Sequence, residues 1–298
     1  MITSARISSV KKLLFLGTGA SSSIPSLSCL LKVPRTCQVC SSAVNPGSLN
    51  RRRNVSLLIQ YCSSVDNSLK TGIIDCGKTF YESCLEWLPR NGINKIDWVL
   101  LTHGHADAMF GLDELRHFNS LQECVNVYLS PECFSVVDQT FPYLTDVSRA
   151  TGGGDVSKIK FHVFDPSTSL NFDGLEFIPV PVAHGEKPGG EAYHCLAFRF
   201  DNIAYISDCS SLSKEQEEIF SNPEILIVDT LREKPLHKSH FSLEESVPLA
   251  QRLSAKKTLL VGMCHRMDHD GSNEELKKLE IDIQLAHDGL CVDINNKD

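Results

Sequence analysis

The sequence predicts an α/β fold made of two mixed β-sheets flanked by helices. Three observations favour it: about a dozen short β-rich runs recur along the 298 residues, Gly, Asn, Asp or Pro bounds each run, and helical patterns lie between several of them. A chain of this length can bury a sizeable core. No internal repeat or linker-like charge run interrupts it, so we expect a single domain over residues 1–298.

The expected elements follow one another in a regular order after a short basic and Ser-rich start, residues 1–12, which we expect to be a flexible N-terminus. Apolar runs of strand length occur at 13–16, 56–61, 72–75, 98–101, 125–129, 161–164, 175–182, 195–200, 203–207, 225–229, 258–262 and 291–294. Helical periodicity occurs at 80–91, 112–119, 131–141, 213–220, 243–254 and 273–278.

Composition excludes several classes of protein. A hydrophobic content of 42% and a charged content of 22% describe a soluble globular chain, and no apolar run approaches the ~20 residues that span a bilayer. The net charge of −8 argues against stable nucleic-acid binding. Most of the cysteines stand singly in apolar strands, where we expect buried thiols at Cys62, Cys76, Cys195 and Cys291. We therefore expect a cytoplasmic protein, with the nucleus as the alternative.

The segment after the strand at 98–101 carries the strongest chemical signal. It places His103, His105 and Asp107 at i, i+2 and i+4 directly behind a rigid apolar strand. Two imidazoles and a carboxylate at this spacing converge on one point when the backbone bends sharply, and these are the ligands that zinc takes. The pattern indicates a metal-dependent hydrolase.

This segment and four others resemble, in the same order, the motifs of the metallo-β-lactamase superfamily. The others are Leu16-Gly-Thr-Gly-Ala20, Ile73-Ile-Asp75-Cys-Gly77, Val182-Ala-His184-Gly and Tyr205-Ile-Ser-Asp208. The resemblance implies the αββα sandwich of that superfamily. Within it, Ser239-His240-Phe-Ser-Leu-Glu-Glu is similar to a segment of the tRNase Z-like and PhnP-like cyclic phosphodiesterase branch.

The resemblance implies a first metal site at His103, His105 and His184. The positions of the second site are Asp107, Ala108, the bridging Asp208 and, counted without gaps from His240, Gly262. The two histidines that bind only the second metal in the family are therefore both missing. Their absence predicts a mononuclear or asymmetric centre. In an alternative register His265 is the missing strand-end histidine and a second-site ligand.

A further pair, Cys37-Gln-Val-Cys40, has the x₂ spacing of metal thiolates. In the relatives such a pair belongs to a structural zinc site, and in the ungapped register His265 completes it. Arg35 stands where the relative has another cysteine, so we expect Cys29 as the fourth ligand, with Cys264 as the alternative. The competing interpretation is two reduced loop thiols.

The family pattern implies a phosphodiesterase that uses a metal-bound hydroxide on a small phosphodiester or nucleotide, cyclic ones included. One catalytic zinc is expected, with manganese or iron as alternatives, beside a second, structural zinc. Asp107 would orient the water or act as base, and His240 would protonate the departing oxygen. The alternatives are a hydrolase of another ester or thioester and a noncatalytic metal-binding scaffold. We expect no membrane partner and leave a homodimer open.

Overall fold

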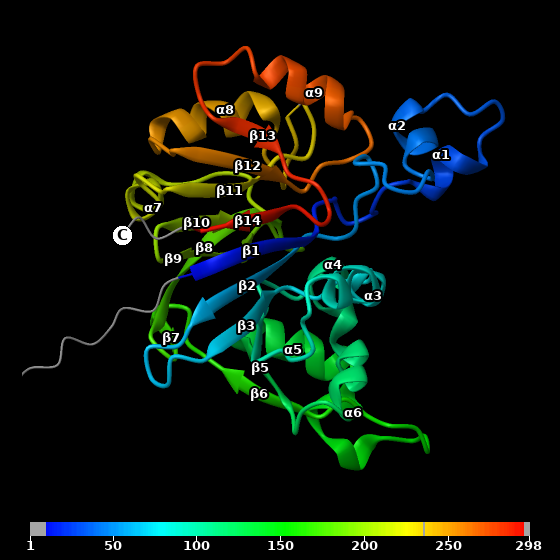
Figure 1. The fold of residues 1–298 in the computed structure, drawn as a ribbon, viewed down its shortest axis with the longest axis vertical. Coiled ribbons are helices and arrows are strands. Elements are labelled where there is room, and N and C mark those ends of the chain that lie inside the picture. The colour runs from blue at the N-terminus through cyan, green and yellow to red at the C-terminus, as the bar shows by residue number, and fades with distance from the viewer. Residues whose placement is uncertain (1–9, 235, 295–298) are drawn as a thin grey trace, which may run out of the picture. The chain divides into compact units, whose positions relative to one another are not determined.

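The computed structural model describes residues 10–234 and 236–294. The described chain divides into two compact units, the first holding residues 10–16, 56–178 and 291–294 and the second residues 17–55 and 179–290. The strands of the described chain form two sheets of seven strands each (Figure 1). Each unit is therefore organised around a sheet of its own.

The first sheet has the strand order β14-β1-β2-β3-β4-β5-β6. It is mixed, because β14 pairs antiparallel with β1 and β2 with β3, whereas β3, β4, β5 and β6 are parallel. Its strands are β1 (Val10–Gly17), β2 (Ser56–Cys62), β3 (Leu69–Ile74), β4 (Trp98–Leu100), β5 (Val125–Leu129), β6 (Ile159–Val163) and β14 (Cys291–Asp293).

The helices of the first unit bury their apolar side chains against this sheet. The shared core joins side chains such as Leu14, Ile73 and Val99 of the strands with Leu112 and Val137 of the helical segments. These segments are α3 (Phe80–Arg90), α4 (Ala106–Met109), η1 (Phe110–Phe118), α5 (Pro131–Thr140), α6 (Pro142–Thr145) and η2 (Val147–Arg149). Removing this apolar area from water stabilises the unit.

The second sheet has the strand order β13-β12-β11-β10-β9-β8-β7. The strands from β10 to β13 are parallel, whereas β9 pairs antiparallel with β10 and β7 with β8. The strands are β7 (Leu170–Phe172), β8 (Leu175–Glu186), β9 (Ala192–Phe200), β10 (Ile203–Ile206), β11 (Ile225–Asp229), β12 (Lys257–Val261) and β13 (Ile283–Leu285). The turn between β7 and β8 falls in the first unit, where Phe172 stacks on Trp98 with ring centroids 4.3 Å apart.

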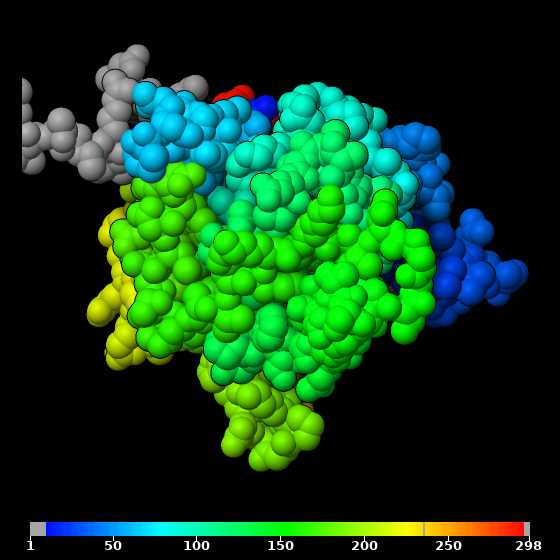
Figure 2. All heavy atoms as spheres, turned by 90° about the horizontal axis from the view of Figure 1, so that it is seen from below, coloured from blue at the N-terminus to red at the C-terminus, as the bar shows by residue number. Residues whose placement is uncertain are grey.

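The second unit contains three helices beside its sheet and a small helical lobe. Helices α7 (Lys214–Ile219), α8 (Leu243–Arg252) and α9 (His269–Leu276) follow strands of the sheet, and Leu249 and Leu276 join its core. The lobe contains α1 (Leu27–Leu31) and α2 (Gln38–Ser42), seen in blue at the right of Figure 2. A separate small cluster around Cys40 and Ile24 is the core of this lobe.

The predicted fold class is confirmed, because the chain forms two mixed sheets flanked by helices with the element order of the αββα fold. The prediction lacks strands β7 and β13, each of three residues. The helix predicted at 112–119 is the 3₁₀ segment η1, whose buried Leu112, Leu115 and Phe118 repeat every three residues.

Two smaller expectations need correction. Strand β1 begins at Val10, so residues 10–12 of the predicted flexible N-terminus belong to the sheet, and residues 1–9 lie outside the described part. Cys76 and Cys195 are buried as expected, but Cys62 is half-buried and Cys291 is exposed. Cys291 is exposed because β14 is an edge strand. Across the described ranges, no helix has the length and apolar character required to cross a membrane.

Candidate functional site

The predicted His-x-His-x-Asp segment lies in the first unit, where the chain leaves β4 and enters α4. His103 is buried at 3% exposure, whereas His105 is exposed and precedes the helix as its N-cap residue. The two imidazole rings lie with centroids 4.5 Å apart and nearly perpendicular. Asp107 occupies the first turn of α4, where the helix dipole favours a carboxylate. The sequence spacing therefore brings these donors to one strand end.

Asp75, at the end of β3, supports this segment through Thr102. Its Oδ1 accepts the Thr102 N–H at 2.8 Å and its Oδ2 accepts the Thr102 hydroxyl at 2.7 Å. Because the single hydroxyl hydrogen goes to Asp75, Thr102 Oγ1 accepts the hydrogen on His103 Nδ1, 2.8 Å away. This network assigns the lone pair of His103 to Nε2, the nitrogen left for a metal.

His184, near the end of β8 in the second unit, is oriented in the same way. It is buried at 5% exposure, and its Nδ1 lies 2.8 Å from the carbonyl oxygen of Ser239. A carbonyl can only accept, so Nδ1 carries the hydrogen and Nε2 the lone pair. Gly185 follows with φ of +93°, and a Cβ there would lie 2.9 Å from Ser239 Oγ. The absence of a side chain at Gly185 allows this close approach.

Asp208 and His240 lie beside His184 in the second unit. The potential ligand atoms of the three residues all lie within 4.8 Å of one another. Asp208 follows β10, and His240 lies three residues before the start of α8. Neutral imidazole and carboxylate are a donor set that suits zinc and related divalent ions. The predicted ligands of the second unit, His184 and Asp208, therefore fit a metal ion, as do His103 and His105 in the first, and His240 lies next to them.

Sequence reasoning missed Asp229, the last residue of β11. Its Oδ2 lies 2.9 Å from His240 Nδ1, whereas Asp208 Oδ1 lies 3.7 Å from the same nitrogen. Burial raises the pKa of Asp229 to about 6, against the opposing effect of His240. The sequence does contain a signal for this residue, because Asp229 ends an otherwise apolar buried strand. Burying a carboxylate costs free energy unless it has a partner.

The two positions where family histidines are missing have no ligating side chain. Ala108 is buried in α4 and its carbonyl accepts the N–H of Cys76 at 2.8 Å. Gly262 has φ of +77°, and a Cβ there would lie 2.5 Å from Asp229 Oδ1. His265 does not replace it in this group, because its ring lies among the cysteines instead.

Cys29, Cys37, Cys40 and His265 form a second cluster, within the second unit. Their ligand atoms lie within 4.8 Å of one another, with His265 Nδ1 3.3 Å from Cys29 Sγ and 3.5 Å from Cys37 Sγ. Three thiols and one imidazole are a ligand set of structural zinc sites, so the residues fit the ion. Burial raises the pKa of Cys40 to about 12, so a metal would displace a proton from this thiol.

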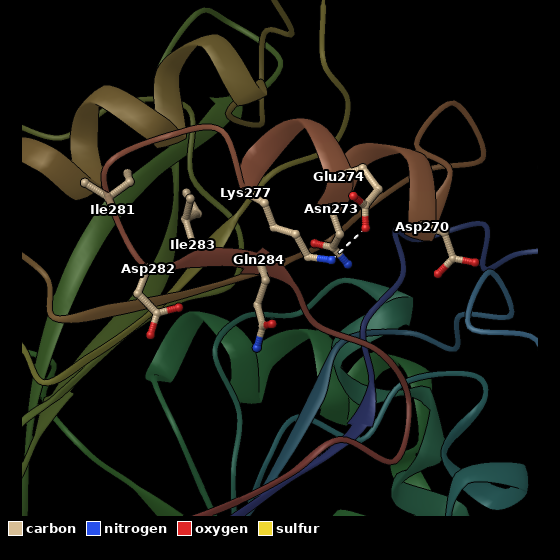
Figure 3. A pocket seen from close by; sticks show the side chains of 8 residues that line it. All are labelled: Asp270, Asn273, Glu274, Lys277, Ile281, Asp282, Ile283 and Gln284. Atoms are coloured by element: carbon tan, nitrogen blue, oxygen red, sulfur yellow. Dashed lines mark hydrogen bonds and ion pairs between the residues drawn. The ribbon is translucent and has the colours of Figure 1, made fainter.

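A hollow beside α9 offers no comparable chemistry (Figure 3). The eight residues that line it contain no histidine or cysteine. Glu274 pairs with Lys277 at 2.6 Å, and both side chains are about 70% exposed. The hollow is therefore a solvated polar surface rather than a metal centre.

Comparison with known proteins places this geometry in a family. The family described as "Beta-lactamase superfamily domain" matches residues 72–263. The chain belongs to the β-lactamase superfamily. This membership confirms the predicted metallo-β-lactamase resemblance and makes the protein a hydrolase of that fold, which implies a bound metal ion.

Three known proteins illustrate what the chain is similar to. A structure described as a new diphosphatase from the PhnP family is 32% identical, with a TM-score of 0.78 over 97% of this chain and 98% of that one. The short form of human tRNase Z shares the fold at 15% identity, with a TM-score of 0.61 over 96% of this chain and all of that one. The octanoyltransferase of Porphyromonas gingivalis is 26% identical over 95% of this chain, which spans about half the length of that relative.

Proposed function

We propose that this superfamily member is a zinc-dependent phosphodiesterase acting on a small phosphodiester, cyclic ones included. The observation that carries the proposal is the fixed tautomer of two buried imidazoles: Thr102 holds Nδ1–H of His103 and the Ser239 carbonyl holds Nδ1–H of His184. Partners of this kind orient metal ligands and raise their basicity. The relative described as a diphosphatase supports chemistry at phosphorus.

We expect the donor set to follow the family arrangement. His103, His105 and His184 would hold the first ion, and Asp208 would bind beside it or fix its ligands. Zinc is favoured among the candidate ions because three neutral imidazoles are typical of its hydrolytic sites, and manganese or iron are the alternatives. When bound, such an ion lowers the pKa of a water molecule to roughly 7 and draws charge from the phosphoryl oxygens.

The remaining polar residues would handle protons. Asp107 would accept a proton from the attacking water, or orient that water, from the first turn of α4. His240 would donate a proton to the departing oxygen as the P–O bond breaks. The cluster at Cys29, Cys37, Cys40 and His265 would hold a second, structural zinc and brace α1 and α2. Such small helices have little core of their own, so a metal would add stability.

A second candidate is hydrolysis of a carboxylic ester or thioester, which the octanoyltransferase description of one relative favours. One experiment separates the two candidates. Zinc-loaded protein is assayed with bis(p-nitrophenyl) phosphate, 2′,3′-cyclic AMP and an octanoyl thioester. The proposal expects turnover of the phosphodiesters, lost in His184→Ala and retained in His117→Ala. His117 is the matched control because it is an exposed histidine that pairs with Glu114 at 3.3 Å.

The other outcomes contradict the proposal in different ways. Thioester turnover without diester turnover would select the second candidate. Bound metal with no turnover of any substrate would indicate a noncatalytic scaffold. Full activity in His184→Ala would remove His184 from the ligand set.

A further inference from the structure

The side chain of Arg52 holds the turn that carries His265, the imidazole of the cysteine cluster. Arg52 Nη1 donates to the carbonyl oxygen of Cys264 at 3.2 Å and to that of Met267 at 2.8 Å. The turn itself is closed by the Met267 N–H, which donates to the Cys264 carbonyl at 3.3 Å. Because these two residues flank His265 in the chain, the guanidinium fixes the backbone from which the imidazole projects.

The backbone of Arg52 is bonded to the segment that carries the cysteines. Its N–H donates to the Ile24 carbonyl at 3.0 Å, and its own carbonyl accepts the Ile24 N–H at 2.7 Å. Two residues further on, the Ser26 N–H donates to Cys40 Sγ at 3.3 Å, and Ser26 is the N-cap residue of α1, which contains Cys29. Arg52 therefore connects both halves of a ligand set that lie far apart in the sequence.

The guanidinium of Arg52 is a buried cation whose hydrogen bonds go to neutral oxygens. The residue is 0% exposed, and its remaining bond joins Nη2 to the amide oxygen of Asn50 at 3.4 Å. Burial lowers the pKa of Arg52 to about 10, so the group stays charged at neutral pH. In the part of the chain that the structure describes, Arg52 forms no ion pair and its Nε has no hydrogen-bond partner. Burying a cation without an anion beside it costs free energy.

We infer that Arg52 is the positioning residue of the cluster of three cysteines and His265, and that it balances the charge of this cluster when metal is bound. The inference rests on the structural metal site of the proposed function. Thiols bind metal as thiolates, so the negative charges of three thiolates exceed the positive charge of a divalent ion by one. A buried guanidinium behind the same turn supplies the opposite charge. It also favours the ionised thiols.

Cobalt(II) is the probe that tests this role. Cobalt bound by thiolates gives charge-transfer absorption, so the signal reports the cysteine cluster and not the histidine and aspartate site. We expect Arg52→Met to weaken cobalt binding at the cluster about 10–100-fold, the usual cost of removing a group that supports metal ligands. Arg52→Lys keeps the charge and several donors, so it should recover most of the affinity.

Arg53→Met is the matched control. Arg53 is also buried, at 8% exposure, but its Nη1 lies 3.7 Å from Asp288 Oδ2, so its charge already has an anion. The control removes a buried arginine next in the sequence and should leave the cobalt affinity of the cluster unchanged. An unchanged affinity in Arg52→Met, or equal losses in Arg52→Met and Arg53→Met, would overturn the inference.

A second pair of variants decides the matter if Arg52→Met does not fold. Arg52→Gln keeps an N–H donor but is neutral, whereas Arg52→Lys is charged. Because a cation favours thiolates, Arg52→Gln should bind cobalt more weakly than Arg52→Lys and should need a higher pH for half-loading. Equal affinities and equal pH midpoints in the two variants would overturn the inference.

The cobalt signal also separates this inference from the proposed function, because it requires no turnover. A protein that cleaves no diester but loads cobalt as expected in all variants would contradict the phosphodiesterase and support the role of Arg52. An active protein whose Arg52 variants all load like the wild type would do the reverse. A wild type without thiolate–cobalt absorption would remove the structural metal site, and the role of Arg52 with it.

Discussion

Replacing Gly262 by Ala should destabilise the protein, because the methyl group would enter the space of Asp229. Two terms contribute. A left-handed residue that is not glycine costs about 1–2 kcal/mol. Forcing extra volume into a packed site, here 2.5 Å from a fully buried carboxylate oxygen, typically costs about 1–3 kcal/mol more. We therefore expect Gly262→Ala to lower the free energy of unfolding by about 2–5 kcal/mol.

This energy converts to a measurable change in melting temperature. Unfolding entropy near 60 °C is about 2.1 cal/mol/K per residue, or about 0.6 kcal/mol/K for the 298-residue chain. The expected decrease in Tm is then about 3–8 °C. Differential scanning calorimetry at fixed zinc concentration measures it, since bound metal raises Tm by mass action.

Gly92→Ala is the matched control. Gly92 has φ of +66°, but no atom lies within 4 Å of the point that an alanine methyl group would occupy, so only the backbone term applies. The control should melt about 2–3 °C lower than the wild type, by the same conversion. In an Asp229→Ala background the contact is absent, and Gly262→Ala should cost no more than Gly92→Ala. Equal decreases for Gly262→Ala and Gly92→Ala, or an undiminished cost without Asp229, would refute the reasoning.

Three further predictions concern the metals and pH. Wild-type protein purified without added metal should contain about two zinc ions per chain and Cys37→Ser/Cys40→Ser about one, by mass spectrometry; about three falling to two would restore a two-metal centre. Thr102→Val should weaken catalytic zinc binding about 10–100-fold in chelator competition, whereas Thr102→Ser keeps the hydroxyl and the affinity. Burial lowers the pKa of His269 from 6.5 to about 4. The unfolded chain therefore takes up a proton first, and about 3 kcal/mol of stability should be lost as pH falls from 6.5 to 4. His269→Gln should flatten this dependence in urea titrations, and an unchanged slope would contradict it.

Local sequence patterns were sufficient to predict most of the helices and strands and the candidate metal ligands. The site at His103, His105 and Asp107 could be predicted because the strand, the turn and the candidate ligands are neighbours in sequence. The order of the motifs then indicated the family, which the superfamily match confirmed. The absence of histidine at Ala108 and Gly262 could also be predicted, because it requires only an alignment of the sequence with the family motifs.

Contacts between distant segments became visible only once the chain was folded. Cys29 lies 236 positions from His265 in the chain, and their contact at 3.3 Å depends on how α1 folds back in the second unit. The partner of His240 is Asp229 because the segment before α8 returns to the end of β11, where the Leu231 N–H donates to the Phe241 carbonyl at 2.9 Å. Burial of that carboxylate, like the tautomers of His103 and His184, is set by three-dimensional surroundings. Local sequence patterns identified the donor residues and the family. The orientation of each donor and the position of its proton depend on the packing of distant segments.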